Sequence, residues 1–217
     1  MNPAKQDFDY WPLFCEENVW QLCRHHHFAQ HKTFAVFISN ETKACTLWLQ
    51  QSASKQDLPV VWDYHVVLFA CSEVLYNGIN NGRWTVWDLD SDLALGISVE
   101  DYLVQTFLPL APGFGHYAPT FRVVEGEVFK ARFSSDRQHM KNSDGTWKSP
   151  PPSWPAIIHE EGLALAELID MKHDECMTLD ELKRAFAAKK PPPIQTTITT
   201  TPASCHTTGK ASDHQPD

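Results

Sequence analysis

Hydrophobic and polar residues alternate along this chain in segments of helical and of strand period. Apolar residues recur at three- and four-residue spacing over residues 15–24, which predicts a helix. Runs of β-branched and aromatic residues indicate strands instead. The predicted strands are residues 33–38, 46–50, 59–70, 84–89 and 119–125, and the further predicted helices are residues 99–108, 160–171 and 179–189.

The run 59–70 is apolar at nearly every position, as in a strand buried on both faces. Its polar exceptions are Asp63 and His65, which side-chain alternation places on one face. Residues 71–83 contain two Asn-Gly pairs, typical of turns. We therefore expect this strand to pair with residues 84–89 as an antiparallel hairpin with a long loop.

The length of 217 residues has room for one domain of ordinary size. Residues 132–155 are polar and proline-rich, which predicts a long ordered loop, and residues 178–181 have the capping-box pattern of a helix start. Pro, Thr and Ser dominate from Pro191 onward. We expect one domain over residues 1–190 and a disordered tail over residues 191–217.

The charge balance excludes several classes of partner. The chain has 18 basic and 27 acidic residues, a net charge of −9, which argues against nucleic-acid binding and against docking on anionic lipid. No secretory signal opens the sequence, and no segment reaches the roughly 18 consecutive apolar residues of a membrane span. We expect a cytoplasmic protein with reduced thiols and no membrane partner.

Metal and cofactor motifs are absent from the sequence. His25–His27 and His31 have no cysteine or acid at a spacing that completes a zinc site. Residues 170–181 have acids at some positions of a calcium-binding loop. However, Lys172 and Glu175 occupy the positions where such a loop requires an acid and a glycine, respectively. The six cysteines form no C-x-x-C pair, at positions 15, 23, 45, 71, 176 and 205. We expect no metal and no cofactor.

Three residues nevertheless suggest chemistry. Cys15 falls where a loop meets a helix, and the free N–H groups and positive dipole end there stabilise a thiolate. Glu16 and Glu17 oppose this effect, so activation needs a cationic partner. His65 sits in an apolar strand, where an imidazole requires a hydrogen-bond partner. If the strands pair, the Asp88 carboxylate can meet Nδ1 of His65, and the other ring nitrogen then faces Cys15.

Each of these residues also has a structural interpretation. A cysteine near a helix start is commonly buried, a strand histidine is commonly a satisfied core residue, and an aspartate at a strand end commonly holds a turn. Cys23, two helical turns beyond Cys15, is expected in the core. Spacing alone therefore does not establish a catalytic triad.

Several segments resemble, in order, blocks of the protein N-terminal glutamine amidohydrolase family. They are FCEENVWQLC at residues 14–23, FAVFISN at 34–40, VWDYHVV at 61–67, WDLD at 87–90 and FSSDRQHMK at 133–141, followed by Asp144-Gly145, Trp147 and Pro150–Pro152. The resemblance spans residues 14–157. The separation of 23 residues between His65 and Asp88 (88 − 65) is long for the family, with the extra length in the predicted loop.

The resemblance implies a function and a fold. It makes Cys15, His65 and Asp88 a catalytic triad that hydrolyses the side-chain amide of an N-terminal glutamine through a Cys thioester, giving N-terminal glutamate and ammonia. It further implies a role in the N-degron pathway, a monomeric protein, and a location in the cytoplasm, with the nucleus as a second location. The implied fold is α+β of papain or transglutaminase type, an antiparallel sheet packed with helices and the cysteine at a helix N-terminus.

Restriction to the first residue of a substrate requires an acid that binds the free α-ammonium. The candidates are Glu16, Glu17, Asp63 and Asp136, among which the sequence does not choose. Two alternatives to the amidohydrolase remain open. One is another papain-like activity, either a protease or a transglutaminase, and the other is a non-catalytic module that binds peptide amino termini.

Overall fold

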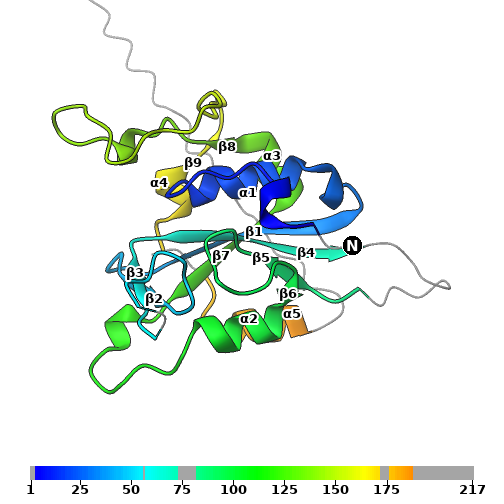
Figure 1. The fold of residues 1–217 in the computed structure, drawn as a ribbon, viewed down its shortest axis with the longest axis vertical. Helices are drawn as coiled ribbons and strands as arrows, with labels where there is room; N and C mark the ends of the chain where they lie inside the picture. The colour runs from blue at the N-terminus through cyan, green and yellow to red at the C-terminus, as the bar shows by residue number, and fades with distance from the viewer. Residues whose placement is uncertain (1–2, 56, 73–81, 172–175, 188–217) are drawn as a thin grey trace, which may run out of the picture.

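The computed structural model of the protein describes residues 3–55, 57–72, 82–171 and 176–187. A five-stranded antiparallel sheet, in the order β6-β5-β4-β1-β7, lies between two groups of helices (Figure 1). Its strands are β1 (His31–Ser39), β4 (His65–Ser72), β5 (Thr85–Trp87), β6 (Ile97–Ser98) and β7 (Thr120–Glu125). The α-helices are α1 (Cys15–Arg24), α2 (Val99–Thr106), α3 (Gly126–Arg132), α4 (Leu165–Leu168) and α5 (Leu179–Ala187).

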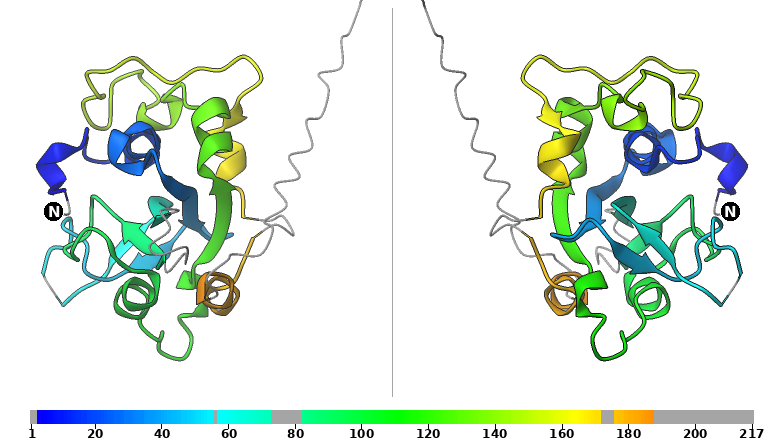
Figure 2. Two further views of the ribbon diagram at one scale, coloured as in Figure 1. Left: turned by 90° about the vertical axis from the view of Figure 1, so that its right-hand side faces the viewer. Right: turned by 90° about the vertical axis from the view of Figure 1, so that its left-hand side faces the viewer.

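The helices form one layer on each face of the sheet. Helices α1, α3 and α4 lie on one face and α2 and α5 on the other, and Figure 2 shows the same three layers from the side. Val66 and Leu68 of β4 belong to the hydrophobic cluster on the α1 face, and Val67 and Phe69 to the cluster on the α2 face. Burial on both faces explains why this strand is apolar at consecutive positions.

Smaller elements surround the layers. Strands β2 (Cys45–Leu47) and β3 (Val60–Trp62) form an antiparallel pair, and β8 (Phe133–Ser134) and β9 (Leu163–Ala164) form a parallel pair. The 3-10 helices are η1 (Lys5–Asp7), η2 (His26–Phe28), η3 (Gly115–Tyr117) and η4 (Gln138–Met140). Among the described residues, no helix has the length and apolar character that crossing a membrane demands.

The prediction of one continuous strand over residues 59–70 is wrong. Strand β3 joins β2, whereas β4 starts at His65 and joins the central sheet. At the break, the Tyr64 N–H donates to the Asp63 side chain at 2.9 Å and the Ser39 hydroxyl donates to the Asp63 carbonyl at 2.5 Å. Asp63 therefore sits in a turn. The predicted antiparallel pairing of the second half with residues 84–89 is confirmed, with Leu68 opposite Trp87.

Other predicted elements differ in extent. Helix α4 covers only four residues of the predicted helix 160–171, and helix α3 has no counterpart among the predictions. Gly126, which opens α3, conceals the helix in the sequence, because glycine is a poor helix former. It is needed there because a Cβ at this position would clash with the side chain of Thr33.

Three further predictions concern the start of α5, the C-terminal tail and the loop after β4. The capping box at the start of α5 is confirmed, since Thr178 N–H donates to Glu181 at 2.8 Å and Glu181 N–H donates to the Thr178 hydroxyl at 3.3 Å. The predicted tail over residues 191–217 and most of the predicted loop over 71–83 lie outside the described residues.

Candidate active site

Cys15 is the first residue of α1, as predicted. The preceding Leu13 has a left-handed backbone with φ of 66°, so the chain turns sharply just before the helix. The Asn18 side chain accepts from the Trp11 N–H and donates to the Trp11 carbonyl, both at 2.8 Å, which fixes the incoming segment. The turn therefore holds Cys15 in place, with 8% of its surface exposed.

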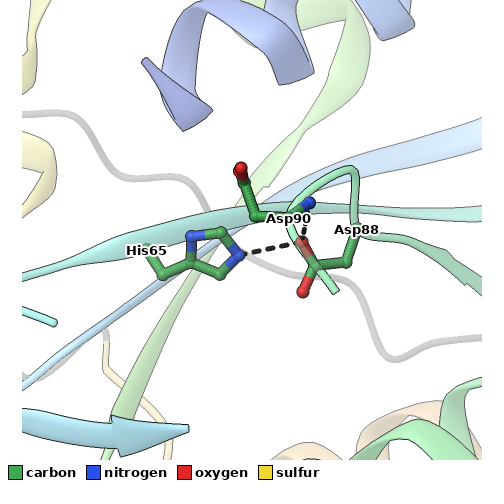
Figure 3. Close-up of side chains that lie close together, drawn as sticks. All are labelled: His65, Asp88 and Asp90. Carbon is green, nitrogen blue, oxygen red and sulfur yellow. Dashed lines mark hydrogen bonds and ion pairs between the residues drawn. The ribbon is translucent and has the colours of Figure 1, made fainter. Parts of the chain in front are cut away.

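His65 and Asp88 form a buried hydrogen-bonded pair. Nε2 of His65 lies 3.0 Å from Oδ1 of Asp88, and Figure 3 shows the other ring nitrogen pointing away from the carboxylate. The prediction that Asp88 meets Nδ1 is therefore wrong. Strand β5 ends at Trp87, opposite Leu68, so Asp88 follows the strand and lies diagonal to His65 rather than opposite it. From that position the carboxylate reaches the far nitrogen of the ring.

The Asp88 carboxylate is saturated with donors. Oδ1 also accepts from the Asp90 N–H at 3.0 Å, and Oδ2 accepts from the Tyr102 hydroxyl at 2.8 Å and from Gln50 Nε2 at 3.4 Å. Burial acts to raise the pKa of Asp88, but the charge and hydrogen bond of His65, with the other donors, lower it overall. Asp88 is therefore a fixed anion.

The histidine ring is held on its other sides as well. The Trp62 indole stacks on His65 with ring centroids 5.5 Å apart and donates to Gln50 Oε1 at 3.3 Å. Burial acts to lower the pKa of His65, but the charge and hydrogen bond of Asp88 raise it overall. Nδ1 is buried and has no hydrogen-bond partner among the described residues. Nδ1 of His65 is therefore available to accept a proton, while Nε2 is held by Asp88.

The environment of Cys15 favours the protonated thiol. Burial, followed by the charges of Glu16 and Asp90, raises the pKa of Cys15 well above its usual value, although a hydrogen bond from the Val66 N–H acts in the opposite direction. The helix start and the neighbouring acids were expected to act in opposite directions, and the net change follows burial and Glu16. Val66 directly follows His65, so this hydrogen bond brings the thiol beside the start of β4.

Glu16 and Glu17 are both completely buried beside Cys15 but have different partners. Glu16 Oε2 lies 3.7 Å from Cys15 Sγ and accepts from the Tyr64 hydroxyl at 2.9 Å. Glu17 receives two hydrogen bonds of 2.7 Å from Arg137 and one of 2.6 Å from the Trp154 indole. Glu17 therefore ties the 132–155 loop to the helix start, whereas Glu16 faces the thiol.

Asp63 and Asp136 are exposed and support turns. Oδ1 of Asp63 accepts from the Tyr64 N–H, and Oδ1 of Asp136 accepts from the Gln138 N–H, both at 2.9 Å. Of the predicted substrate-binding acids, only Glu16 and Glu17 are completely buried beside Cys15.

Asp90 is an acid of the site that the sequence reasoning did not select. It accepts from the Tyr10 hydroxyl at 2.6 Å, and one atom each of His65, Asp88 and Asp90 lie within 4.8 Å of one another (Figure 3). These residue types also occur in metal sites, but here His65 Nε2 and Asp88 Oδ1 satisfy each other. Asp90 matches the second acid of the WDLD segment, which is the signal that points to it.

The further residues that sequence reasoning missed are Gln50, Tyr64, Tyr102 and His139. Tyr64 lies within the WDYHV segment beside His65, and His139 lies within FSSDRQHMK. Gln50 and Tyr102 carry no signal of their own, because only the folded chain brings them to Asp88.

Known proteins resemble the chain over the whole of this site. The model of the N-terminal glutamine amidase family matches residues 10–188. The protein N-terminal glutamine amidohydrolase of Danio rerio is 34% identical over 202 residues, covering 87% of this chain and 94% of that protein. The Homo sapiens protein of the same name is 36% identical over 197 residues, covering 87% of this chain and 92% of that protein. That of Arabidopsis thaliana is 37% identical over 172 residues, covering 76% of each chain.

Proposed function

Because this chain belongs to the N-terminal glutamine amidase family, we propose that it hydrolyses the side-chain amide of N-terminal glutamine. In this proposal Cys15 is the nucleophile, His65 carries the proton, and Asp88 is the anion that orients His65. The reaction consumes water and yields N-terminal glutamate and ammonia. The free, buried Nδ1 of His65, opposite the nitrogen held by Asp88, carries this assignment.

The catalytic cycle has two halves. Cys15 first gives its proton to Nδ1 of His65, and the thiolate attacks the side-chain carbonyl carbon. His65 then donates that proton to the departing nitrogen, so that ammonia leaves and a thioester to Cys15 remains. In the second half, His65 removes a proton from water, the hydroxide adds to the thioester, and the proton returns to sulfur as the glutamate product leaves. Asp88 stabilises the imidazolium in both halves.

The start of α1 supplies donors for the oxyanion. The first backbone hydrogen bond of this helix runs from Asn18 N–H to the Phe14 carbonyl, so the N–H groups of residues 15–17 take no part in the helical ladder. Donors aimed at the developing oxyanion stabilise the transition state more than the ground state. We assign this role to the N–H groups beside Cys15.

Glu16 is the acid that we assign to the α-ammonium of the substrate. Both oxygens of Glu17 are engaged by Arg137, and Asp63 and Asp136 hold exposed turns. Glu16 alone of the four combines complete burial, contact with Cys15 and a carboxylate oxygen without a hydrogen bond.

The wider assignments follow the family resemblance. Cys15 lies at a helix start that packs against an antiparallel sheet. The sheet carries His65, and Asp88 lies just beyond the neighbouring strand. This arrangement supports a fold of papain or transglutaminase type. We propose that residues 1–190 form the catalytic domain and that it acts as a monomer in the cytoplasm and nucleus. The glutamate product would feed the N-degron pathway.

Three short peptides test the reaction: one that starts with Gln, one that starts with Asn, and one with only an internal Gln. Ammonia release and the mass change of deamidation are measured for the wild type, Cys15→Ala and Cys23→Ala. Cys23 is a matched control because it is a buried thiol of the same helix. We expect activity on the first peptide only, lost in Cys15→Ala and retained in Cys23→Ala.

The other outcomes favour the alternatives. Activity on internal Gln, or cleavage of peptide bonds, would indicate a transglutaminase or a protease instead. A folded wild type that binds the Gln-initiated peptide without releasing ammonia would favour a binding module.

A further inference from the structure

Glu16 is a buried carboxylate that the protein only half satisfies. Its side chain is completely buried, and Oε2 is occupied by the Tyr64 hydroxyl, but Oε1 has no hydrogen-bond partner in the described part of the chain. Buried carboxylate oxygens without partners are costly and uncommon. Nε2 of the His139 imidazole lies 3.5 Å from Oε1.

The ring nitrogen Nε2 of His139 lies next to Glu16 Oε1, in a position that a substrate nitrogen could occupy instead. Its Nε2 also lies 3.1 Å from the Tyr64 hydroxyl, so a nitrogen stands between two oxygens that would both bind an ammonium. The His139 side chain is 27% exposed and belongs to the short helix η4 of the 132–155 loop, not to the sheet. A substrate nitrogen can therefore take its place once the ring turns aside.

The charges that act on Cys15 are mainly negative. Glu16 of α1 and the acids Asp88 and Asp90, which follow β5, all act to keep the proton on sulfur, and the Val66 N–H of β4 acts against them. Tyr64 and Tyr10 add neutral hydroxyls to this environment. Two basic side chains in this part of the molecule have partners of their own: Arg137 binds Glu17, and Lys5 donates to Gln51.

We propose that Glu16 couples recognition of the amino terminus to activation of the nucleophile: the substrate α-ammonium binds Glu16 in place of His139, and neutralising this carboxylate allows Cys15 to pass its proton to His65. The proton moves from Sγ to Nδ1, so thiol and neutral imidazole become thiolate and imidazolium. The proposal rests on the assigned reaction, since it takes N-terminal glutamine as the substrate.

This coupling would select the first residue of a chain twice. An internal or acetylated glutamine has no cation for Glu16, so it loses the ion pair and also meets a thiol that is still protonated. The burial of Cys15 and its raised pKa make the same thiol a poor target for oxidants between turnovers.

Alkylation of Cys15 by iodoacetamide measures the coupling without turnover. The rate is followed by intact mass and peptide mapping at neutral pH, alone, with glycyl-alanine amide, and with its N-acetyl derivative. Glycine has no side chain, so the dipeptide supplies the ammonium but leaves the thiol open. We expect the free amine to accelerate alkylation about tenfold, as removal of one close negative charge would do, and the acetylated dipeptide to have no effect.

Glu16→Gln identifies the group responsible. This variant should be alkylated at the accelerated rate without any dipeptide, and should not respond further. Glu100→Gln, which removes an exposed acid of α2 on the opposite face of the sheet, should respond like the wild type. If Glu16→Gln does not fold, His139→Ala provides the second test, because uncovering Oε1 should lower the dipeptide concentration needed for half of the acceleration.

Equal alkylation rates of the wild type with the free and the acetylated dipeptide would overturn the proposal, as would a Glu16→Gln variant that still responds. An enzyme that deamidates N-terminal glutamine without amine-dependent alkylation would refute the coupling and leave the assigned reaction intact. Amine-dependent alkylation in a protein that releases no ammonia would refute the reaction instead.

Discussion

Hydrogen bonds decide the chemistry at the scale of single residues. His65 uses one ring nitrogen for Asp88 and keeps the other free, and Asp88 in turn is held by Tyr102, Gln50 and the Asp90 N–H. A hydrogen-bond network of this kind around the Asp88 carboxylate fixes both the orientation and the tautomer of the imidazole. The position of the proton on His65 therefore depends on groups outside the proposed triad.

Asp88→Asn tests the orienting role. An amide cannot stabilise the imidazolium and allows the wrong tautomer, so kcat/KM for the Gln-initiated peptide should fall by about three to four orders of magnitude. Tyr102→Phe removes one donor to Asp88 but leaves the His65 contact, and should cost about tenfold or less. Steady-state ammonia release on folded variants measures both. A loss below tenfold in Asp88→Asn would contradict the role.

The same pair predicts how stability depends on pH. The folded pKa of His65 lies above its usual 6.5, so its contribution is complete below that value and is lost as the pH rises through the folded pKa. The folded pKa of Asp88 lies below its usual 3.8, so its contribution is present above that value and is lost as the pH falls through the folded pKa. The charged pair therefore stabilises most between these two values.

Urea unfolding across pH measures this contribution. The difference in unfolding free energy between the wild type and Asp88→Asn should be largest between about pH 4 and pH 6.5 and should shrink on either side. A difference that does not change with pH would show that the pair is not ionised in the folded protein.

The residues of the proposed triad can be selected from the sequence, but their contacts cannot. Cys15, His65 and Asp88 follow from their segments and the family resemblance, whereas the bonded ring nitrogen depends on where β5 ends. The high pKa of Cys15 depends on burial and on Glu16 together. His139 reaches Glu16 only through the folded 132–155 loop, so no local pattern reveals that contact.

At the scale of elements, the first turn of α1 organises a distant loop. Arg137, itself in a left-handed backbone conformation with φ of 59°, forms a buried bidentate ion pair with Glu17. Its guanidinium also donates to the carbonyls of Pro152, Trp154 and Pro155. This pair explains why a polar, proline-rich segment is ordered and why His139 stays over Glu16.

Breaking this pair should destabilise the protein strongly. Arg137→Met leaves the Glu17 carboxylate buried without its partner, which should cost about 3–5 kcal/mol of unfolding free energy. The double variant Glu17→Gln/Arg137→Met should recover part of that loss, because no charge is then left buried. Urea unfolding of the wild type, both single variants and the double variant measures the coupling. Additive losses in the double variant would contradict a direct ion pair.

Helices and strands were predicted correctly where the spacing of apolar residues in the sequence matches their burial in the fold. Helix α1 and the pairing of β4 with β5 follow from apolar patterns, and α5 follows from its capping box. The break between β3 and β4 was missed because the apolar run continues across it, while the change of partner strand is set by Asp63 and Ser39.

At the scale of the whole molecule, the three layers bring the parts of the site together. Helix α1 packs against β4 on one face of the sheet, and α2 lies on the other face (Figure 1). From α2, the Tyr102 hydroxyl donates to Asp88. The proposed nucleophile and the histidine–aspartate pair thus come from different layers, and the site is covered from both sides. This arrangement makes one chemical prediction, a covalent intermediate on Cys15.

Trapping that intermediate is the most direct test. The enzyme is mixed with excess Gln-initiated peptide, quenched in acid within one turnover, and analysed by intact mass and peptide mapping, with Cys23→Ala as the matched control. We predict an adduct equal to the peptide less ammonia, located on Cys15 in both proteins and absent from Cys15→Ala. An adduct on another residue, or a Cys15→Ala variant that still releases ammonia, would contradict the assignment of Cys15 as the nucleophile.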